Sequence, residues 1–128
     1  MSPTDTLAVT LDAPDSVRAG EPVPVTISIT NQSGRSLTLH LQGREIVFDV
    51  TVSREDGIPV WRRLAGAAVQ AILRVEQLEA GGEIILRATW SQQDATGKPV
   101  RPGTYYLQGS VPTDGDPLVT PPRELKIS

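Results

Sequence analysis

Residues 23–30 read Val-Pro-Val-Thr-Ile-Ser-Ile-Thr. Apolar Val and Ile alternate with Pro, Thr and Ser, which is the period of two expected of a β-strand with one buried face. β-branched residues stand on both faces, and their restricted side-chain torsions favour a pleated surface over a helix. The stretch therefore predicts a strand whose Val and Ile side chains face a core.

The same alternation recurs along the chain at intervals of roughly ten residues, separated by Gly, Pro, Asn and Asp turns. Further strands are predicted at residues 7–12, 37–42, 46–52, 58–63, 84–90, 105–111 and 125–127, the last as an edge strand. Two long loops are predicted, Ser91–Gly103 and Thr113–Pro122. Residues 64–78 stay ambiguous between a short helical piece near Ala65–Ala68 and a strand through Val75.

The polar positions within two of these runs indicate which face of each strand points inward. Asp49 belongs to the polar set of its run, so Ile46, Phe48, Val50 and Val52 are expected to face the core. Arg87 belongs to the polar set of a later run, so the inward residues there are expected to be Ile84, Leu86, Ala88 and Trp90.

The pattern predicts an all-β fold, an immunoglobulin-like antiparallel β-sandwich of about eight or nine strands. No βαβ periodicity and no internal repeat is present, and the 128 residues are interpreted as a single domain, 1–128. Pro102-Gly103-Thr104-Tyr105 matches a tyrosine corner, in which the hydroxyl bonds back to the preceding backbone. Leu107 then occupies the place of a disulfide cysteine; the alternative is an ordinary strand tyrosine.

Composition excludes several classes of function. The chain has no cysteine, which excludes disulfides, cysteine-ligated zinc and thiol nucleophiles. A net charge of −3 argues against nucleic-acid binding, and no apolar run is long enough to span a membrane. The first residues lack the basic and apolar parts of a signal peptide.

No catalytic or metal site is predicted, so we expect no cofactor and no enzyme activity. His40 is the only histidine and lies on the polar side of its strand, unlike the pocketed histidine of a catalytic triad. Asp114-Gly115-Asp116 is interpreted as a turn, because it lacks the pattern of a calcium loop. Trp61, followed by Arg62, is either a core residue or an exposed anchor for a protein partner.

The order of several motifs resembles the BsuPI-type intracellular proteinase inhibitor domain. The motifs are an early strand ending in Asn31, the strand Phe48-Asp49-Val50, an Asp-Gly turn into Val60-Trp61-Arg62, Leu78–Glu83, a strand ending in Trp90, and Gly97–Tyr105. The resemblance covers roughly residues 7 to 111. The chain departs from it at Ala65–Ala68, where members often carry an aromatic residue, and at Ala80-Gly81-Gly82, where they commonly show Pro-Gly.

The resemblance implies a protein that binds an intracellular subtilisin-like serine protease through surface loops. Candidate contact residues are Leu118 and Val119 in one long loop, and Lys98 and Val100 in the other, with Trp61 and Arg62 as a further partner surface. A rigid scaffold would hold such a loop at little ordering cost. The alternative is a non-inhibitory binding or assembly module that uses an edge strand. The resemblance implies a cytoplasmic protein, whereas a removed leader would imply export.

Overall fold

The computed structural model describes residues 7–42, 46–64, 73–113 and 116–128 as an all-β fold. Eleven strands are found in these residues, where eight or nine were predicted, and the two additional ones contain two residues each. The strands are β1 (Leu7–Asp12), β2 (Ser16–Val17), β3 (Val23–Asn31), β4 (Leu37–Gln42), β5 (Asp49–Arg54), β6 (Pro59–Arg62), β7 (Leu73–Leu78), β8 (Glu83–Trp90), β9 (Gly103–Val111), β10 (Leu118–Val119) and β11 (Arg123–Ile127).

Two sheets form the sandwich. One has the order β1-β3-β8, and the other has the order β2-β11-β9-β5-β6, with β10 paired to β9. All pairings are antiparallel except that between β11 and β2. The chain crosses from the first sheet to the second between β1 and β2, at Ala13-Pro14-Asp15. This is the immunoglobulin-like, disulfide-free sandwich that the sequence predicted.

The core lies between the sheets and follows the predicted alternation. Along β3, Val23, Val25, Ile27 and Ile29 are at most 2% exposed. Three of their partners on β8, Ile84, Leu86 and Ala88, face the same side but are only partly buried, because β8 is the edge of its sheet. The fourth, Trp90, is fully buried. Gly109 on β9 faces Ile27 so closely that a Cβ there would lie 2.5 Å from the Ile27 Cδ1 atom.

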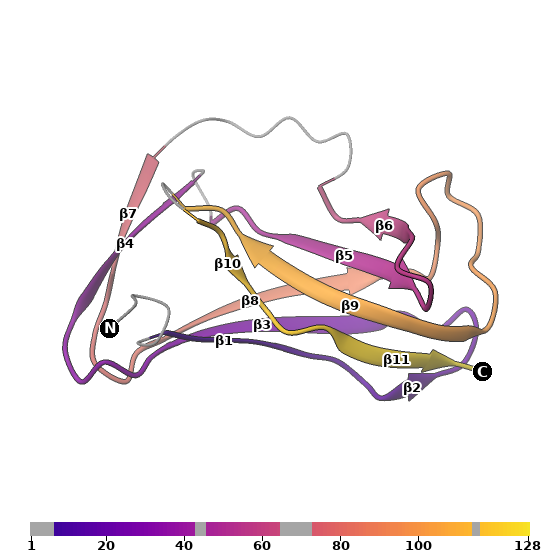
Figure 1. The fold of residues 1–128 in the computed structure, drawn as a ribbon, viewed down its shortest axis with the longest axis horizontal. Helices are drawn as coiled ribbons and strands as arrows, with labels where there is room; N and C mark the ends of the chain where they lie inside the picture. The colour runs from indigo at the N-terminus through magenta and orange to yellow at the C-terminus, as the bar shows by residue number, and fades with distance from the viewer. Residues whose placement is uncertain (1–6, 43–45, 65–72, 114–115) are drawn as a thin grey trace.

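A ribbon of β4 and β7 turns away from the two sheets at one end of the molecule (Figure 1). The ribbon continues the β3–β8 ladder beyond Asn31, whose backbone N–H donates to the Gly82 carbonyl. The Asn31 side chain is buried, and its amide donates to the carbonyls of Arg35, Leu78 and Glu79. Asn31 therefore fixes the bend between sandwich and ribbon.

Three predictions about the strands need correction. Asp49 was expected to face solvent and is 4% exposed, because it is covered by Arg62, at the end of β6, and by Leu64, two residues beyond that strand. β11 was expected at an edge, but β2 pairs with its last two residues. The second predicted loop contains β10. The predicted helical piece at Ala65–Ala68 and the turn at Asp114-Gly115 lie outside the described residues.

Candidate functional site: a braced loop at one end of the sandwich

The loop between β8 and β9, residues 91–102, projects from the end of the sandwich opposite the β4–β7 ribbon (Figure 1). It stands beside the β5–β6 hairpin, to which it is tied by a 2.9 Å hydrogen bond from the Ala95 N–H to the Val60 carbonyl. Residues 95–99, at its tip, are all exposed. The loop is therefore the prominent feature of this end of the molecule.

Asp94 braces the tip from inside. Its Oδ1 atom accepts hydrogen bonds from the Thr96 hydroxyl (2.6 Å), the Thr96 N–H (2.8 Å) and the Lys98 N–H (3.1 Å). The Asp94 N–H donates in turn to the Lys98 carbonyl, 2.8 Å away. These bonds, the hydroxyl of Thr96 first and the backbone N–H of Lys98 next, lower the pKa of Asp94. The carboxylate form thus holds the turn closed.

Gln92 fastens the base of the loop to a segment far away in the sequence. Its Nε2 donates to the carbonyls of Arg18 and Glu21, each 2.7 Å away, and its Oε1 accepts from the Gly20 N–H. The residue is 2% exposed and has a φ of 59°. Such a left-handed backbone is uncommon outside glycine, and here three side-chain hydrogen bonds and one from the Val100 N–H to the Gln92 carbonyl maintain it.

An aromatic cluster lies beneath the loop and bonds to both of its arms. The rings of Trp61 and Tyr105 pack against Trp90 with centroid distances of 6.3 and 5.9 Å. Trp90 donates from Nε1 to the Gln93 carbonyl (2.9 Å), and the Tyr105 hydroxyl donates to the Arg101 carbonyl (2.6 Å). The second bond confirms the predicted tyrosine corner. Both arms of the loop are thus fixed to the core.

An open hollow of about 630 Å³ separates the loop from the β5–β6 hairpin, and Arg54, Lys98 and Arg101 line it. Arg54 forms an ion pair with Asp56, whose hydrogen bond raises the pKa of Arg54 and lowers the pKa of Asp56. Lys98 and Arg101 are exposed. Asp94 also lines the hollow on the loop side. Since Asp56 offsets Arg54, the loop side carries two cations, Lys98 and Arg101, against the one carboxylate of Asp94.

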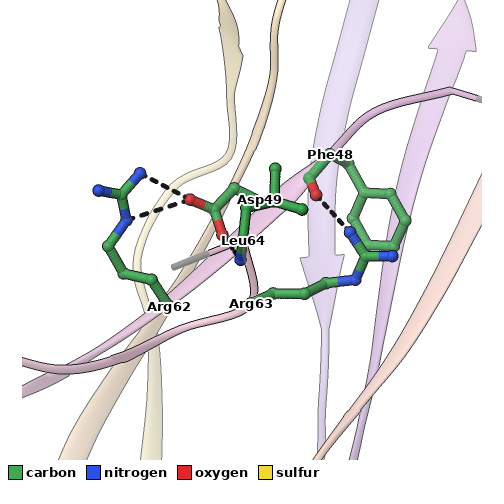
Figure 2. A network of polar contacts seen from close by, with 5 residues as sticks. All are labelled: Phe48, Asp49, Arg62, Arg63 and Leu64. Atoms are coloured by element: carbon green, nitrogen blue, oxygen red, sulfur yellow. Dashed lines mark hydrogen bonds and ion pairs between the residues drawn. The ribbon is translucent and has the colours of Figure 1, made fainter. Parts of the chain in front are cut away.

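A buried carboxylate positions the other predicted partner surface (Figure 2). Asp49 Oδ2 accepts from Nε and Nη2 of Arg62, at 3.1 and 2.8 Å, and its Oδ1 accepts from the Leu64 N–H. Arg63 donates to the Phe48 carbonyl and lies 3.9 Å from the centre of the Phe48 ring. These contacts hold the end of β6, and with it Trp61, against β5.

The structure brings some predicted contact residues together and separates others. Lys98 and Val100 lie in the braced loop, and the Ala95–Val60 hydrogen bond places that loop beside the strand of Trp61 and Arg62. Trp61 is partly buried against Trp90, while the Arg62 side chain is 60% exposed even though it is paired with Asp49.

Leu118 and Val119 lie at the other end of the molecule. They pair with Val111 and Ser110, at the opposite end of β9 from the braced loop. Because a strand advances about 3.3 Å per residue, the two ends of β9 are about 26 Å apart. Leu118 is 9% exposed and belongs to the core, so only Val119, at 48%, presents an apolar side chain to solvent.

Sequence reasoning missed the two residues that brace the loop, Gln92 and Asp94. The Asp94-Ala95-Thr96-Gly97 stretch carried a usable signal, since Asp followed two residues later by Thr and then by Gly is typical of a side-chain-capped turn. Gln92 carried none, because its partners lie more than 70 residues earlier in the chain.

Comparison with known families identifies the chain. Residues 10–115 match the BsuPI family, described as intracellular proteinase inhibitor. The chain belongs to the BsuPI family. The match covers the braced loop, Asn31, the Asp49 network and the tyrosine corner, which are the features that position the candidate surface. The family is one of inhibitors, not of enzymes, and the partner that it implies is a protein. No curated protein matches the chain.

Solved structures share the fold of this BsuPI domain at low sequence identity. Spo0M, a sporulation control protein from Bacillus subtilis, is 10% identical with a TM-score of 0.59, and the match covers 96% of this chain and 49% of Spo0M. The DNA glycosylase AlkC of Pseudomonas fluorescens is 15% identical with a TM-score of 0.50, and the match covers 95% of this chain and 30% of AlkC. A β-glucosidase of Listeria innocua is 16% identical with a TM-score of 0.50, and the match covers 95% of this chain and 16% of the glucosidase. The chain spans less than half the length of each protein, and these similarities show the fold alone.

Two features of the described residues bear on other functions. Over residues 7–42, 46–64, 73–113 and 116–128, no group of three or more His, Asp or Glu side chains is placed to hold a metal ion. The same residues contain no helix long and apolar enough to cross a membrane.

Proposed function

We propose that this BsuPI domain inhibits a serine protease of the subtilisin class, and that the loop 91–102 with Lys98 and Val100 makes the contact. The observation that carries the proposal is the bracing of this loop on both arms and at its tip. A loop that is already ordered loses little conformational entropy when it enters a cleft, so more of the contact energy appears as affinity.

The mode of contact follows from which atoms the loop leaves free. The N–H and carbonyl of Lys98 are both bonded to Asp94. The tip therefore has no free strand edge at Lys98 with which to pair along a substrate-binding cleft, and it would act as a compact wedge. Its side chains, Lys98 above all, and the neighbouring Arg101 would make the contacts.

The proposal assigns a supporting role to the strand of Trp61 and Arg62. Arg62 stands beside the loop with an exposed guanidinium, while Asp49 holds its Nε and one terminal nitrogen. Arginine at the rim of an interface contributes through its remaining donors and through its planar stacking surface.

The test is an inhibition assay with the full chain against subtilisin-class, trypsin-like, cysteine and metallo proteases. Lys98→Glu is compared with Lys126→Glu, which makes the same charge change on an exposed lysine of β11. We expect the inhibition constant to rise at least about tenfold for Lys98→Glu only, as for the loss of a central contact.

Val119→Lys tests the opposite end of the molecule and is expected to leave inhibition unchanged. If Val119→Lys abolishes inhibition while Lys98→Glu does not, the contact lies at β10 and the proposed loop is wrong. If the chain at about 50 μM inhibits none of the proteases, any binding is weaker than about −6 kcal/mol. In that case the domain is a non-inhibitory binding module.

A further inference from the structure

β8 is the longest strand at a sheet edge in the described part of the chain, with eight residues against six in β1, four in β6 and two in β2. Natural proteins protect such edges with proline, bulges, lysine or short strands. β6 has Pro59 and a register shift in its pairing with β5. β8 has neither, and its pairing with β3 is continuous from Trp90 to Glu83.

Apolar side chains remain open on both faces of this edge. Ile85 is 36% exposed on the outer face. On the core side, Ile84 and Leu86 are only partly buried, although their partners on β3, Ile29 and Ile27, are fully buried. The edge therefore offers apolar contacts on either side of its backbone.

The ladder with β3 decides which backbone groups of β8 point to the open edge. The Asn31 N–H bonds to the Gly82 carbonyl, and hydrogen-bonded pairs alternate along an antiparallel ladder. Ile84 and Leu86 therefore bond to β3, and the N–H and C=O groups of Glu83, Ile85 and Arg87 point outward.

We infer that β8 pairs with β8 of a second copy of this chain, antiparallel, about a two-fold axis at Ile85. In this register Ile85 faces Ile85 of the second copy, and Glu83 of each chain faces Arg87 of the other. Three residue pairs exchange about six backbone hydrogen bonds. On the core side, Ile84 of each chain meets Leu86 of the other.

Charge complementarity selects both the partner and the register. An axis at Arg87 would place the two Arg87 side chains opposite each other, and an axis at Leu86 would set Arg87 against Ile85. Only the axis at Ile85 gives two opposite-charge cross-strand pairs. Among the described residues, neither Glu83 nor Arg87 has an ion-pair partner within the chain; the Glu83 carboxylate accepts only a long, exposed hydrogen bond from the Thr30 hydroxyl, at 3.4 Å.

Sedimentation equilibrium of the full chain tests the dimer through charge exchange. We expect a monomer–dimer equilibrium whose dissociation constant rises at least about tenfold for Glu83→Arg and for Arg87→Glu, because each places like charges opposite one another twice. The double variant Glu83→Arg/Arg87→Glu is expected to dimerise as the original chain does. A chain that stays monomeric up to about 500 μM, or a double variant no tighter than the singles, overturns the inference.

The absence of cysteine provides a second measurement that does not depend on charge. Ile85→Cys would bring two sulfur atoms together across the axis, since hydrogen-bonded pairs have Cα atoms about 5.5 Å apart, within disulfide range. Thr10→Cys is the matched control, because Thr10 pairs with Ser28, which pairs with Ile85, on the same outer face. We expect mild oxidation to link Ile85→Cys chains covalently and to leave Thr10→Cys chains monomeric; equal yields overturn the inference.

Discussion

The backbone N–H of Lys98 donates to the carboxylate of Asp94, and the Lys98 carbonyl accepts from the Asp94 N–H, so the two residues close the tip of the 91–102 loop. This pair connects a surface lysine, the central contact of the proposed inhibitor, to a side chain that touches no partner. The shape of the contact surface is therefore set by a residue behind it.

Replacing Asp94 by Ala removes the acceptor of three hydrogen bonds and should loosen the tip without unfolding the domain. We expect amide hydrogen exchange at Thr96 and Lys98 to become at least about tenfold faster. Asp94→Asn is the matched control, because its amide oxygen can still accept from the same donors. Exchange that is equally slow in Asp94→Ala would show that the tip is held by other contacts.

The same tip should open in acid. The pKa of Asp94 is lower in the folded state than in the unfolded chain, where it is about 3.9. The stabilisation of the tip by the Asp94 carboxylate is therefore fully present above the unfolded pKa and is lost as pH falls through the lower folded pKa. We expect the Thr96 and Lys98 amides to lose protection below about pH 4. NMR exchange measurements across this range check it, and Asp94→Asn should abolish the dependence on pH.

Gln92→Ala should destabilise the whole domain. It removes the side-chain hydrogen bonds to the carbonyls of Arg18 and Glu21 and to the Gly20 N–H, of which the Arg18 carbonyl keeps its bond from the Glu21 N–H. It also keeps a left-handed backbone that alanine disfavours. Loss of buried hydrogen bonds of this kind costs about 2 kcal/mol. Urea denaturation gives the value. Gln93→Ala, at an exposed neighbour that accepts the Trp90 hydrogen bond with its backbone carbonyl, should change stability by less than about 0.5 kcal/mol.

The hydrogen bonds of Asp49 are expected to stabilise the end of β6. Asp49→Ala frees Arg62 and leaves the Leu64 N–H without its acceptor, and we expect a loss of about 1–2 kcal/mol of stability. Arg62→Ala leaves a buried carboxylate with one neutral donor and should cost about as much. If Asp49→Ala alone destabilises the domain, the Leu64 bond, and not the ion pair, holds the end of β6.

Asn31→Asp tests the bend between sandwich and ribbon with almost no change in shape. The amide nitrogen that donates to three carbonyls becomes an oxygen that faces them. We expect a loss of about 3 kcal/mol, measured by chemical denaturation. Gln32→Glu, the same chemical change at the exposed next residue, should have little effect.

The sequence predicted what depends on local pattern. The alternation at residues 23–30 and 84–90 assigned the inward residues, and the tyrosine corner was visible because Pro-Gly-Thr-Tyr is a short motif. The prediction for Asp49 was wrong because the residues that cover it, Arg62 at the end of β6 and Leu64 just beyond it, lie 13 and 15 residues later in the chain. The crossing at Ala13-Pro14-Asp15 brings β2 beside β11. This pairing joins residues far apart in the sequence, so no local pattern predicts it.

For the candidate site, the sequence predicted only a choice of surfaces. The sequence marked two loops and could not choose between them, because burial of Leu118 depends on pairing with β9. It also could not show that residues 91–102 are ordered, since the bracing atoms of Gln92, Trp90 and Tyr105 meet only in the folded chain.

Bonds on both arms of the 91–102 loop have a consequence for its fate inside a protease. If a peptide bond at the tip were cut, the arm from Ser91 would stay fastened through Gln92 and Trp90, and the arm to Pro102 through Arg101 and Tyr105. The new amine and carboxylate would remain close together, the product would leave slowly, and rejoining would compete with release. Under the proposed function, a nicked molecule would therefore still occupy the enzyme, and the bonds on both arms would slow its release as a product.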